Sequence, residues 1–306
     1  MIPIALTIIA ATWAGLAAER RWPEQAGIGS RKALTGVLYT VLPAVVFLNL
    51  NRVEFDHDFA IGIALGWVVV IFCTFVTFFI GSRFLALERP QIGALLCCIL
   101  VANSAYLGYP LVAALLGLDS LGDAVAFDVA VGTMALLLGA FSVGAAFGTK
   151  AGETPRDRVR AFFTRNIPLY AAVLAVLAPE SLSPEWAVDA SRIAIALMLP
   201  VGFFAVGAAL AEGEEEDEFR FPPPLTKPTA VVIGVKLILM PALLFLLALP
   251  LIELPDSFLL LAAMPSGLNA MIVVQAYGLD LKITANALVW TTAIVVPVAL
   301  VASFVT

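Results

Sequence analysis

The chain has 306 residues, of which 61% are hydrophobic and only 13% charged, and its formal net charge is −6 at pH 7. A soluble globular domain is nearer half apolar and a quarter charged, so this composition excludes an ordinary soluble protein and indicates an all-α integral membrane protein.

A membrane-spanning helix needs roughly 20 predominantly apolar residues. Ten stretches approach this length, and they leave no room for a sizeable soluble domain. The first stretch could be mistaken for a secretory signal, but its positive charges follow the apolar residues, so we interpret it as a true first helix. In chain order the predicted spans are 2–18, 33–50, 59–81, 91–116, 122–147, 166–178, 190–211, 228–250, 256–277 and 282–305.

The basic residues predict the orientation of these spans. All but three of the 17 lysines and arginines fall in the loops after spans 1, 3, 5, 7 and 9; the exceptions are Arg52, Arg192 and Lys236. Loops rich in Lys and Arg stay in the cytoplasm. The sequence therefore predicts a multi-pass protein of the cell (plasma) membrane with both termini outside. The acidic run EGEEEDEF at 212–219 lies in a predicted cytoplasmic loop, and we interpret it as a solvated linker.

The ten spans divide into two similar halves of five. IPIAL opens span 1 and IPLYA opens span 6; LPAVVF lies in span 2 and LPVGFF in span 7; GLD ends both span 4 and span 9. Because five is odd, the second half must be inverted in the membrane, an arrangement typical of secondary transporters. We expect a first repeat over 1–148, a cytoplasmic connection over 149–165 and a second, inverted repeat over 166–306.

Spans 4 and 9 contain residues that interrupt helices. Span 4 has NSAYLGYP at 103–110, and span 9 has AMPSGLNA at 263–270. Proline removes a backbone hydrogen bond, and unpaired backbone persists in a membrane only where protein or a water-filled cavity satisfies it. Two breaks in corresponding spans predict a binding site near the midplane. The predicted substrate-binding residues are Asn103, Ser104, Tyr106, Gly108, Pro110, Pro265, Ser266, Gly267 and Asn269.

Two ionisable residues lie well inside spans, Asp128 in span 5 and Lys236 in span 8. An intramembrane charge is costly and is by default a functional hypothesis. We predict a coupling or charge-pairing role for both. Lys236 could instead extend towards the cytoplasm, Asp128 could be solvated near the outer face, and the two could pair with each other.

The sequence contains no nucleotide-binding P-loop, hydrolase elbow or metalloprotease motif, and the three cysteines (Cys73, Cys97 and Cys98) have no metal-ligand spacing. Its single histidine, His57, lies among polar residues of an outer loop, where solvation is the simpler interpretation. We therefore expect neither an enzyme nor a metal site nor a cofactor. A coupling ion, H⁺ or Na⁺, stays open.

The motifs NSAYLGYP and AAMPSGLNAMIVVQAYGLD (262–280) resemble those of the auxin efflux carrier family, with support from LPAVVFLNL, LPVGFFAVGAAL and KLILMP. The resemblance implies a fold similar to the bile acid:sodium symporters, in which broken helices 4 and 9 cross. Helices 1, 2, 6 and 7 would form a scaffold, and helices 3–5 and 8–10 a moving transport domain. On that analogy Pro110 and Pro265 mark the crossing, and Asn103 and Asn269 contribute to an anion site.

Members of that family move auxin or small carboxylates, so the resemblance implies a carrier of a small organic anion that works by elevator-like alternating access. The long cytoplasmic loop of plant auxin carriers is missing here, which favours the short prokaryotic branch. The expected partners are the anion, the lipid bilayer and a possible second copy of the chain, without nucleic acid. Two alternatives stay open: a non-transporting receptor or sensor on the same scaffold, and a sodium-coupled organic-anion symporter of the bile acid type.

Overall fold

The computed structural model describes residues 2–51, 57–117, 120–151, 154, 156–157, 160, 163–164, 167–211 and 223–302. These residues are helical apart from short connections and one isolated antiparallel bridge, so the predicted all-α class is confirmed. The acidic run 212–219 and outer-loop residues 52–56 lie outside the described residues.

The helices of the first half include several π-helical segments, which are labelled η. They are α1 (Ile2–Arg21), α2 (Pro23–Gly36), η1 (Val37–Val41), α3 (Leu42–Leu50), α4 (His57–Phe79), η2 (Ile80–Phe84), α5 (Arg89–Leu100), η3 (Ser104–Gly108), α6 (Tyr109–Leu115), α7 (Leu121–Phe127), η5 (Asp128–Thr133), η6 (Ala135–Ala140), α8 (Phe141–Phe147) and the 3₁₀ turn η7 (Thr149–Ala151).

The second half has fewer interruptions. Its elements are α10 (Ile167–Leu177), the 3₁₀ turn η8 (Glu180–Leu182), α11 (Glu185–Ala211), α12 (Lys227–Ile233), η9 (Gly234–Leu239), α13 (Met240–Ala248), α14 (Asp256–Ala262), α15 (Leu268–Tyr277) and α16 (Leu281–Ala302).

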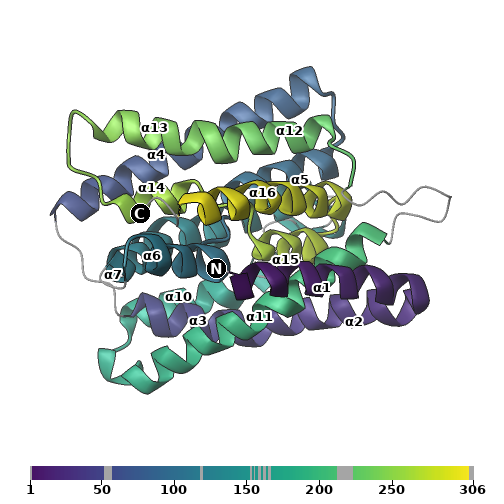
Figure 1. The fold of residues 1–306 in the computed structure, drawn as a ribbon, viewed down its shortest axis with the longest axis horizontal. Helices are drawn as coiled ribbons and strands as arrows, with labels where there is room; N and C mark the ends of the chain where they lie inside the picture. Colours follow the sequence, from purple (N-terminus) through teal and green to yellow (C-terminus); the bar gives the residue numbers. More distant parts are fainter. Residues whose placement is uncertain are drawn as a thin grey trace.

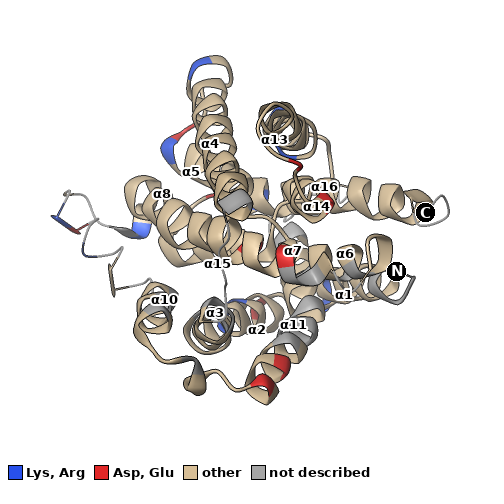
Figure 2. Cartoon of the chain, turned by 90° about the vertical axis from the view of Figure 1, so that its left-hand side faces the viewer, with Lys and Arg blue, Asp and Glu red and all other residues tan. Residues whose placement is uncertain are grey.

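Five helical runs of the described part are long and apolar enough to cross a membrane, namely Pro23–Leu48, Phe59–Phe84, Asp123–Phe147, Lys227–Ala248 and Leu281–Ala302. Figure 2 shows how few charged residues these helices carry, and that most of those lie near helix ends. Both observations support a multi-pass membrane protein. They leave the ten-span inverted layout and the side of each terminus as predictions.

The second span is longer than the sequence predicted. Residues 19–32 were expected to contain a loop, but the helical run that includes α2, η1 and α3 begins at Pro23. Pro23 occupies the first helical position, where its missing N–H group costs no hydrogen bond. The first turns of α2 are polar and largely exposed, and they precede the apolar residues from which the second span was predicted. Hydropathy therefore gave no sign that the helix begins so early.

The helices lie in three layers (Figure 1). One outer layer contains α4, α12 and α13, and the opposite outer layer contains α1–α3, α10 and α11. The segments α5–α7 and α14–α16 lie between them. Within the second outer layer α1 packs along α11 and α10 packs along α3, so each half of the chain supplies helices to the same layer.

The helices α1 and α11 cross with their backbones in contact. A Cβ atom on Gly15 would lie 2.1 Å from the carbonyl oxygen of Phe204, and one on Gly207 would lie 2.1 Å from that of Thr12. Both distances are far below van der Waals contact. The two glycines therefore face each other's helices at the crossing and set how closely the helices approach.

Candidate functional site

The helix of predicted span 4 is broken at Val101–Asn103. Helix α5 ends at Leu100, Val101 is extended (φ −105°, ψ 113°), and a helical run resumes at Ser104. Predicted span 9 is broken in the same way, since α14 ends at Ala262 and α15 begins at Leu268. Both predicted interruptions are therefore present. The first one lies several residues before Gly108 and Pro110, to which the sequence had assigned it.

The two broken segments pair with each other. The Asn103 N–H group donates to the Pro265 carbonyl oxygen at 2.8 Å, and the Gly267 N–H group donates to the Val101 carbonyl oxygen at 2.9 Å. Ala102 and Ser266 form the antiparallel bridge between these bonds. Each break thus satisfies backbone groups that the other leaves free, as non-helical backbone at membrane depth requires.

The Ser266 side chain adds a further connection to α5. Its hydroxyl donates to the Cys98 carbonyl oxygen at 2.9 Å, and the Ser266 N–H group donates to the Thr291 hydroxyl on α16 at 3.3 Å. The last turn of α5 has free carbonyl groups, because every helix leaves its final four without partners inside the helix. Ser266 satisfies one of them from the partner segment.

Lys236 satisfies the next carbonyl of the same turn. Its side chain is 2% exposed, and its ammonium group donates to the Ile99 carbonyl oxygen at 2.6 Å. The C-terminal end of a helix carries a partial negative charge that a cation offsets. The alternative interpretation, that this lysine extends to the cytoplasm, is therefore wrong: Lys236 holds the end of α5 at the break.

Asp128 contacts the opposite side of the break. Its carboxylate accepts a short hydrogen bond from the Ser104 hydroxyl and a second from the Tyr109 hydroxyl at 2.7 Å. The Asp128 side chain is buried, which contradicts the solvated interpretation. Ser104 begins η3 and Tyr109 begins α6, the two helical segments that follow the break in span 4. The Asp128 carboxylate on η5 therefore connects these two segments.

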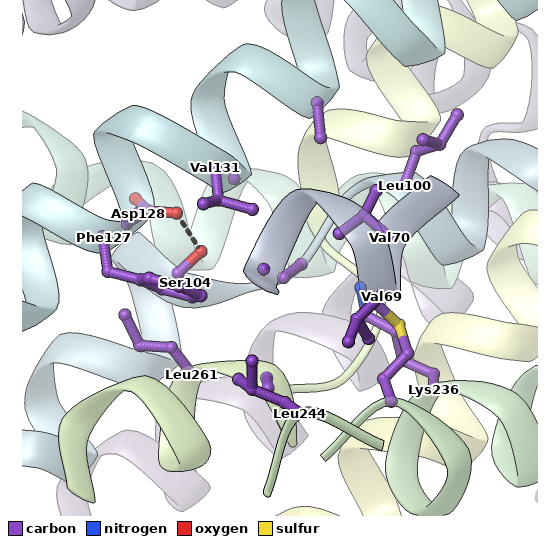
Figure 3. Close-up of a pocket in the computed structure, with 16 residues that line it drawn as sticks. Val69, Val70, Leu100, Ser104, Phe127, Asp128, Val131, Lys236, Leu244 and Leu261 are labelled. Atoms are coloured by element: carbon purple, nitrogen blue, oxygen red, sulfur yellow. Dashed lines mark hydrogen bonds between the residues drawn. The ribbon is translucent and has the colours of Figure 1, made fainter. Parts of the chain in front are cut away.

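Asp128 and Lys236 line one cavity (Figure 3). The Asp128–Ser104 pair and Lys236 lie on different sides of this view, with apolar residues such as Val69 and Leu244 also on the wall. The cavity volume is about 40 Å³, room for about two to four water molecules at roughly 10–15 Å³ each. Among the described residues no ion pair joins Asp128 to Lys236, so the two charges face a shared space without direct pairing.

Two asparagines at the breaks have unsatisfied amides. The Asn103 side chain is 1% exposed, and neither its amide oxygen nor its amide nitrogen has a hydrogen-bond partner in the described residues. The Asn269 amide oxygen in the first turn of α15 is likewise buried without a partner there. Most buried polar side-chain atoms in proteins are satisfied, so an unpartnered amide at a helix break calls for an explanation such as a ligand or water.

The structure does not bring all the predicted site residues together. Gly108 packs against α14, where a Cβ would lie 2.6 Å from the Leu261 side chain. Tyr106 lies in η3, and Pro110 lies in α6, downstream of the paired segments. Those that lie in the pairing or in the first turn beside it are Asn103, Ser104, Pro265, Ser266, Gly267 and Asn269.

Sequence reasoning missed Tyr109, although it stands beside Pro110 in the quoted motif. It also missed that three cavity residues, Ser104, Asp128 and Lys236, each lie in a π-helical segment. Such segments occur often at functional sites. Hydropathy carries no signal for them.

We expect Lys236→Met to destabilise the protein by about 1–3 kcal/mol, because the Ile99 carbonyl oxygen loses its buried donor while the apolar stem is kept. Thermal unfolding in detergent measures the change. Lys227→Met, at an exposed position at the start of α12, is the matched control and should unfold at the wild-type temperature. Equal unfolding temperatures for Lys236→Met and wild type would contradict this structural role.

Comparisons with known proteins agree with the membrane architecture. Residues 164–303 match the family described as "Membrane transport protein". The chain is also 22% identical over 276 residues to an uncharacterized transporter of Methanocaldococcus jannaschii, covering 84% of this chain and 83% of that protein. The second half of the chain is thus similar to the membrane transport protein family, and most of the chain is similar to a transporter. The family match lies in the second half of the chain and includes the break in span 9, Lys236 and the whole of α15.

Proposed function

We propose that this protein is a secondary active transporter or facilitative carrier of a small organic anion, which binds where the two broken spans pair. The family and the M. jannaschii relative support transport in general. The observation that carries the finer proposal is the Asn103 amide, which is buried at the pairing and whose two polar atoms have no partner among the residues that the structure describes.

An anion suits the polar groups at this place. The Asn103 amide nitrogen can donate to a carboxylate, and helix α15 begins beside the pairing with Asn269 in its first turn. The N-terminal end of a helix carries a partial positive charge and free N–H groups, which favour anions. The cavity between Asp128 and Lys236 has a volume of about 40 Å³, and Ala102 and Ser104 of the first broken segment lie on its wall, so it adjoins the proposed substrate site.

We further propose that transport proceeds by elevator-like alternating access. The layer that contains α1–α3, α10 and α11 would be the scaffold, supported by the packing of α1 on α11 and of α10 on α3. The remaining helices, which include both breaks, would move against it. The two broken segments would then move together, because the hydrogen bonds between them lie within the proposed transport domain.

The experiment is uptake of labelled malonate, malate and indole acetate into proteoliposomes, with Na⁺ present or replaced by a large organic cation, and with and without a pH gradient. Uptake of one anion supports the carrier. Binding without uptake under any gradient would favour the alternative of a receptor or sensor. Uptake that needs Na⁺ would favour the sodium-coupled symporter; we expect Na⁺ independence, because the Lys236 ammonium already occupies the carbonyl end of α5.

We expect Asn103→Ala to weaken anion binding about 10- to 100-fold, the equivalent of losing one hydrogen bond to a charged group at about 1.5–3 kcal/mol. The ligand-free protein should lose little stability, because no described residue forms a hydrogen bond with the amide that is removed. Ligand-induced shifts in unfolding temperature measure both effects. Ser257→Ala on α14 is the control, because it also removes a buried polar atom that has no partner within the described part of the chain, and it should bind as wild type does.

Equal binding by Asn103→Ala and wild type would remove Asn103 from the site. The same measurement on Asn269→Ala tests the second amide. If both variants bind normally, the substrate lies elsewhere in the protein.

A further inference from the structure

The two buried charges offset opposite ends of one broken helix. Lys236 contacts the last turn of α5, where the helix end is partly negative, and Asp128 contacts the first residue after the break, where the next helix end is partly positive. The helical run from Ser104 to Leu115 is continuous, since Gly108 and Tyr109 between η3 and α6 both have α-helical angles. A carboxylate that belongs to the protein therefore lies beside the positive end of this run, where it accepts from the Ser104 hydroxyl.

The usual capping group of this run is not used. Asn103 stands at the N-cap position, yet its side chain makes no capping hydrogen bond and has no partner in the described residues. Helix α15, the counterpart in the other broken span, has no acidic residue in its first turn. The two helix starts at the pairing thus differ. The Asp128 carboxylate lies at the start of η3, whereas the first turn of α15 contains no acidic side chain of its own.

Glycine at position 132 makes this contact possible. A Cβ atom on Gly132 would lie 2.3 Å from the Asp128 carboxylate oxygen and 3.5 Å from the Ser104 hydroxyl. The absence of a side chain one turn further along the same helix lets the carboxylate turn back towards Ser104. An alanine at 132 would therefore push the carboxylate away from Ser104 without changing any charge.

We propose that Asp128 is an internal competitor of the substrate anion, and that a proton controls the competition. The ionised carboxylate occupies the positive end of the run Ser104–Leu115, and its protonation frees that end for the substrate carboxylate beside Asn103. This inference deepens the proposed function and rests on it. Proton and anion then bind cooperatively, so each favours the other by the same factor.

Besides Asp128, two ionisable side chains face this place, so the comparison with Asp128→Asn decides whether Asp128 sets the pH dependence. The groups that face Asp128 are the Ser104 and Tyr109 hydroxyls and, across the cavity, the Lys236 ammonium. The residues of α4, α13 and α14 on the cavity wall are apolar or glycine, α3 and η6 contain no ionisable residue, and Asp123 on α7 is exposed. A phenol titrates near about 10 and stays protonated at neutral pH.

The direction of the effect follows from the competition. Below the titration of Asp128 the carboxyl is neutral, the helix end is free and the anion binds tightly. As the pH rises through that titration, the affinity should fall by up to about tenfold per pH unit, the limit for one linked proton. A monocarboxylate carried together with this proton would move without net charge.

The test is the dissociation constant between pH 5.5 and 7.5, expressed for the fully ionised probe, because the second carboxyl of a dicarboxylate still titrates near the acid end of this range. The probe is whichever of malonate, malate and indole acetate binds the wild type most tightly. We expect the affinity of the wild type to fall as the pH rises. Asp128→Asn should bind the probe at every pH as tightly as the wild type does at the acid end of the range. Asp123→Asn, which removes an exposed carboxylate from the preceding helix, should keep the wild-type slope.

A second readout does not depend on Asp128→Asn folding correctly. Anion binding to the wild type at neutral pH should take up protons from the buffer and produce the infrared band of a protonated carboxyl group. Gly132→Ala should weaken the pH dependence, because it displaces the carboxylate from Ser104. Binding of the probe with a flat pH profile and no proton uptake would overturn the inference while leaving the proposed function in place. Failure of all three anions to bind would overturn both.

Discussion

Replacing Gly267 by alanine should strongly impair transport, with uptake falling at least about tenfold. The Cβ atom would lie 2.4 Å from the Ala102 carbonyl oxygen and 2.8 Å from its carbonyl carbon. These are backbone atoms of the partner segment, so no flexible side chain can move aside. We expect the Gly267–Val101 and Asn103–Pro265 hydrogen bonds to break together, since the two segments must separate.

The effect comes from close approach, not from backbone conformation. Gly267 has φ −87° and ψ 150°, angles that any residue adopts. Forcing an extra methyl group into such a contact costs about 1–3 kcal/mol, and each 1.4 kcal/mol is worth about tenfold in an equilibrium. Buried backbone groups without partners would add to that cost at membrane depth.

Gly234→Ala on η9 is the matched control for this variant. A Cβ atom at Gly234 has no neighbour within 4 Å, so the same chemical change should leave uptake at the wild-type level. Uptake by proteoliposomes and thermal unfolding in detergent are measured for both variants. Wild-type uptake by Gly267→Ala would show that transport does not depend on the paired segments.

The sequence predicted the two breaks because polar and helix-breaking residues stand out in an apolar stretch. It placed the first break at Gly108 and Pro110, whereas the chain leaves the helix at Val101–Asn103. Pro110 is the second residue of α6 and lies inside the helical run that resumes at Ser104. A proline signals that a helix is perturbed nearby, but the partner segment decides where the backbone opens.

The pairing register also depended on contacts that the sequence does not contain. Matching the GLD motifs would place Ser104 opposite Pro265, whereas Ala102 bridges to Ser266 and Asn103 donates to Pro265. Bridged residues in two short segments are selected by hydrogen bonds and by the close approach at Gly267. The GLD motifs lie at the ends of spans 4 and 9, several helical turns from the paired segments. They therefore fix the offset between the two halves only to within a turn or two at the pairing.

The roles of the two buried charges could be suspected but not assigned from the sequence. An intramembrane lysine and aspartate suggest function or pairing, and direct pairing was one of the open alternatives. Instead Lys236 contacts a carbonyl 137 positions earlier in the chain, and Asp128 contacts two hydroxyls of the broken span. Hydropathy locates a charge along its own helix, whereas these partners depend on how the helices pack.

Replacing Gly207 by alanine should have the largest effect on folding, because it separates two helices whose backbones touch. The new Cβ would lie 2.1 Å from the Thr12 carbonyl oxygen and 2.9 Å from the Leu16 nitrogen on α1. We expect a loss of about 3 kcal/mol, at the upper end of the range for overpacking, and a correspondingly lower unfolding temperature in detergent. Gly36→Ala tests the same substitution at an exposed position of α2 that has no neighbour within 4 Å; it should stabilise slightly, because alanine favours helix by about 1 kcal/mol over glycine.

The reciprocal contact at Gly15 makes this prediction sharper. Gly15→Ala alone should cost about as much as Gly207→Ala, since its Cβ would lie 2.1 Å from the Phe204 carbonyl oxygen. The double variant should cost clearly less than the sum, because helices separated by the first methyl group already leave room for the second. Additive losses would mean that each alanine acts on its own helix, and that the backbones of α1 and α11 do not meet at these glycines in the membrane.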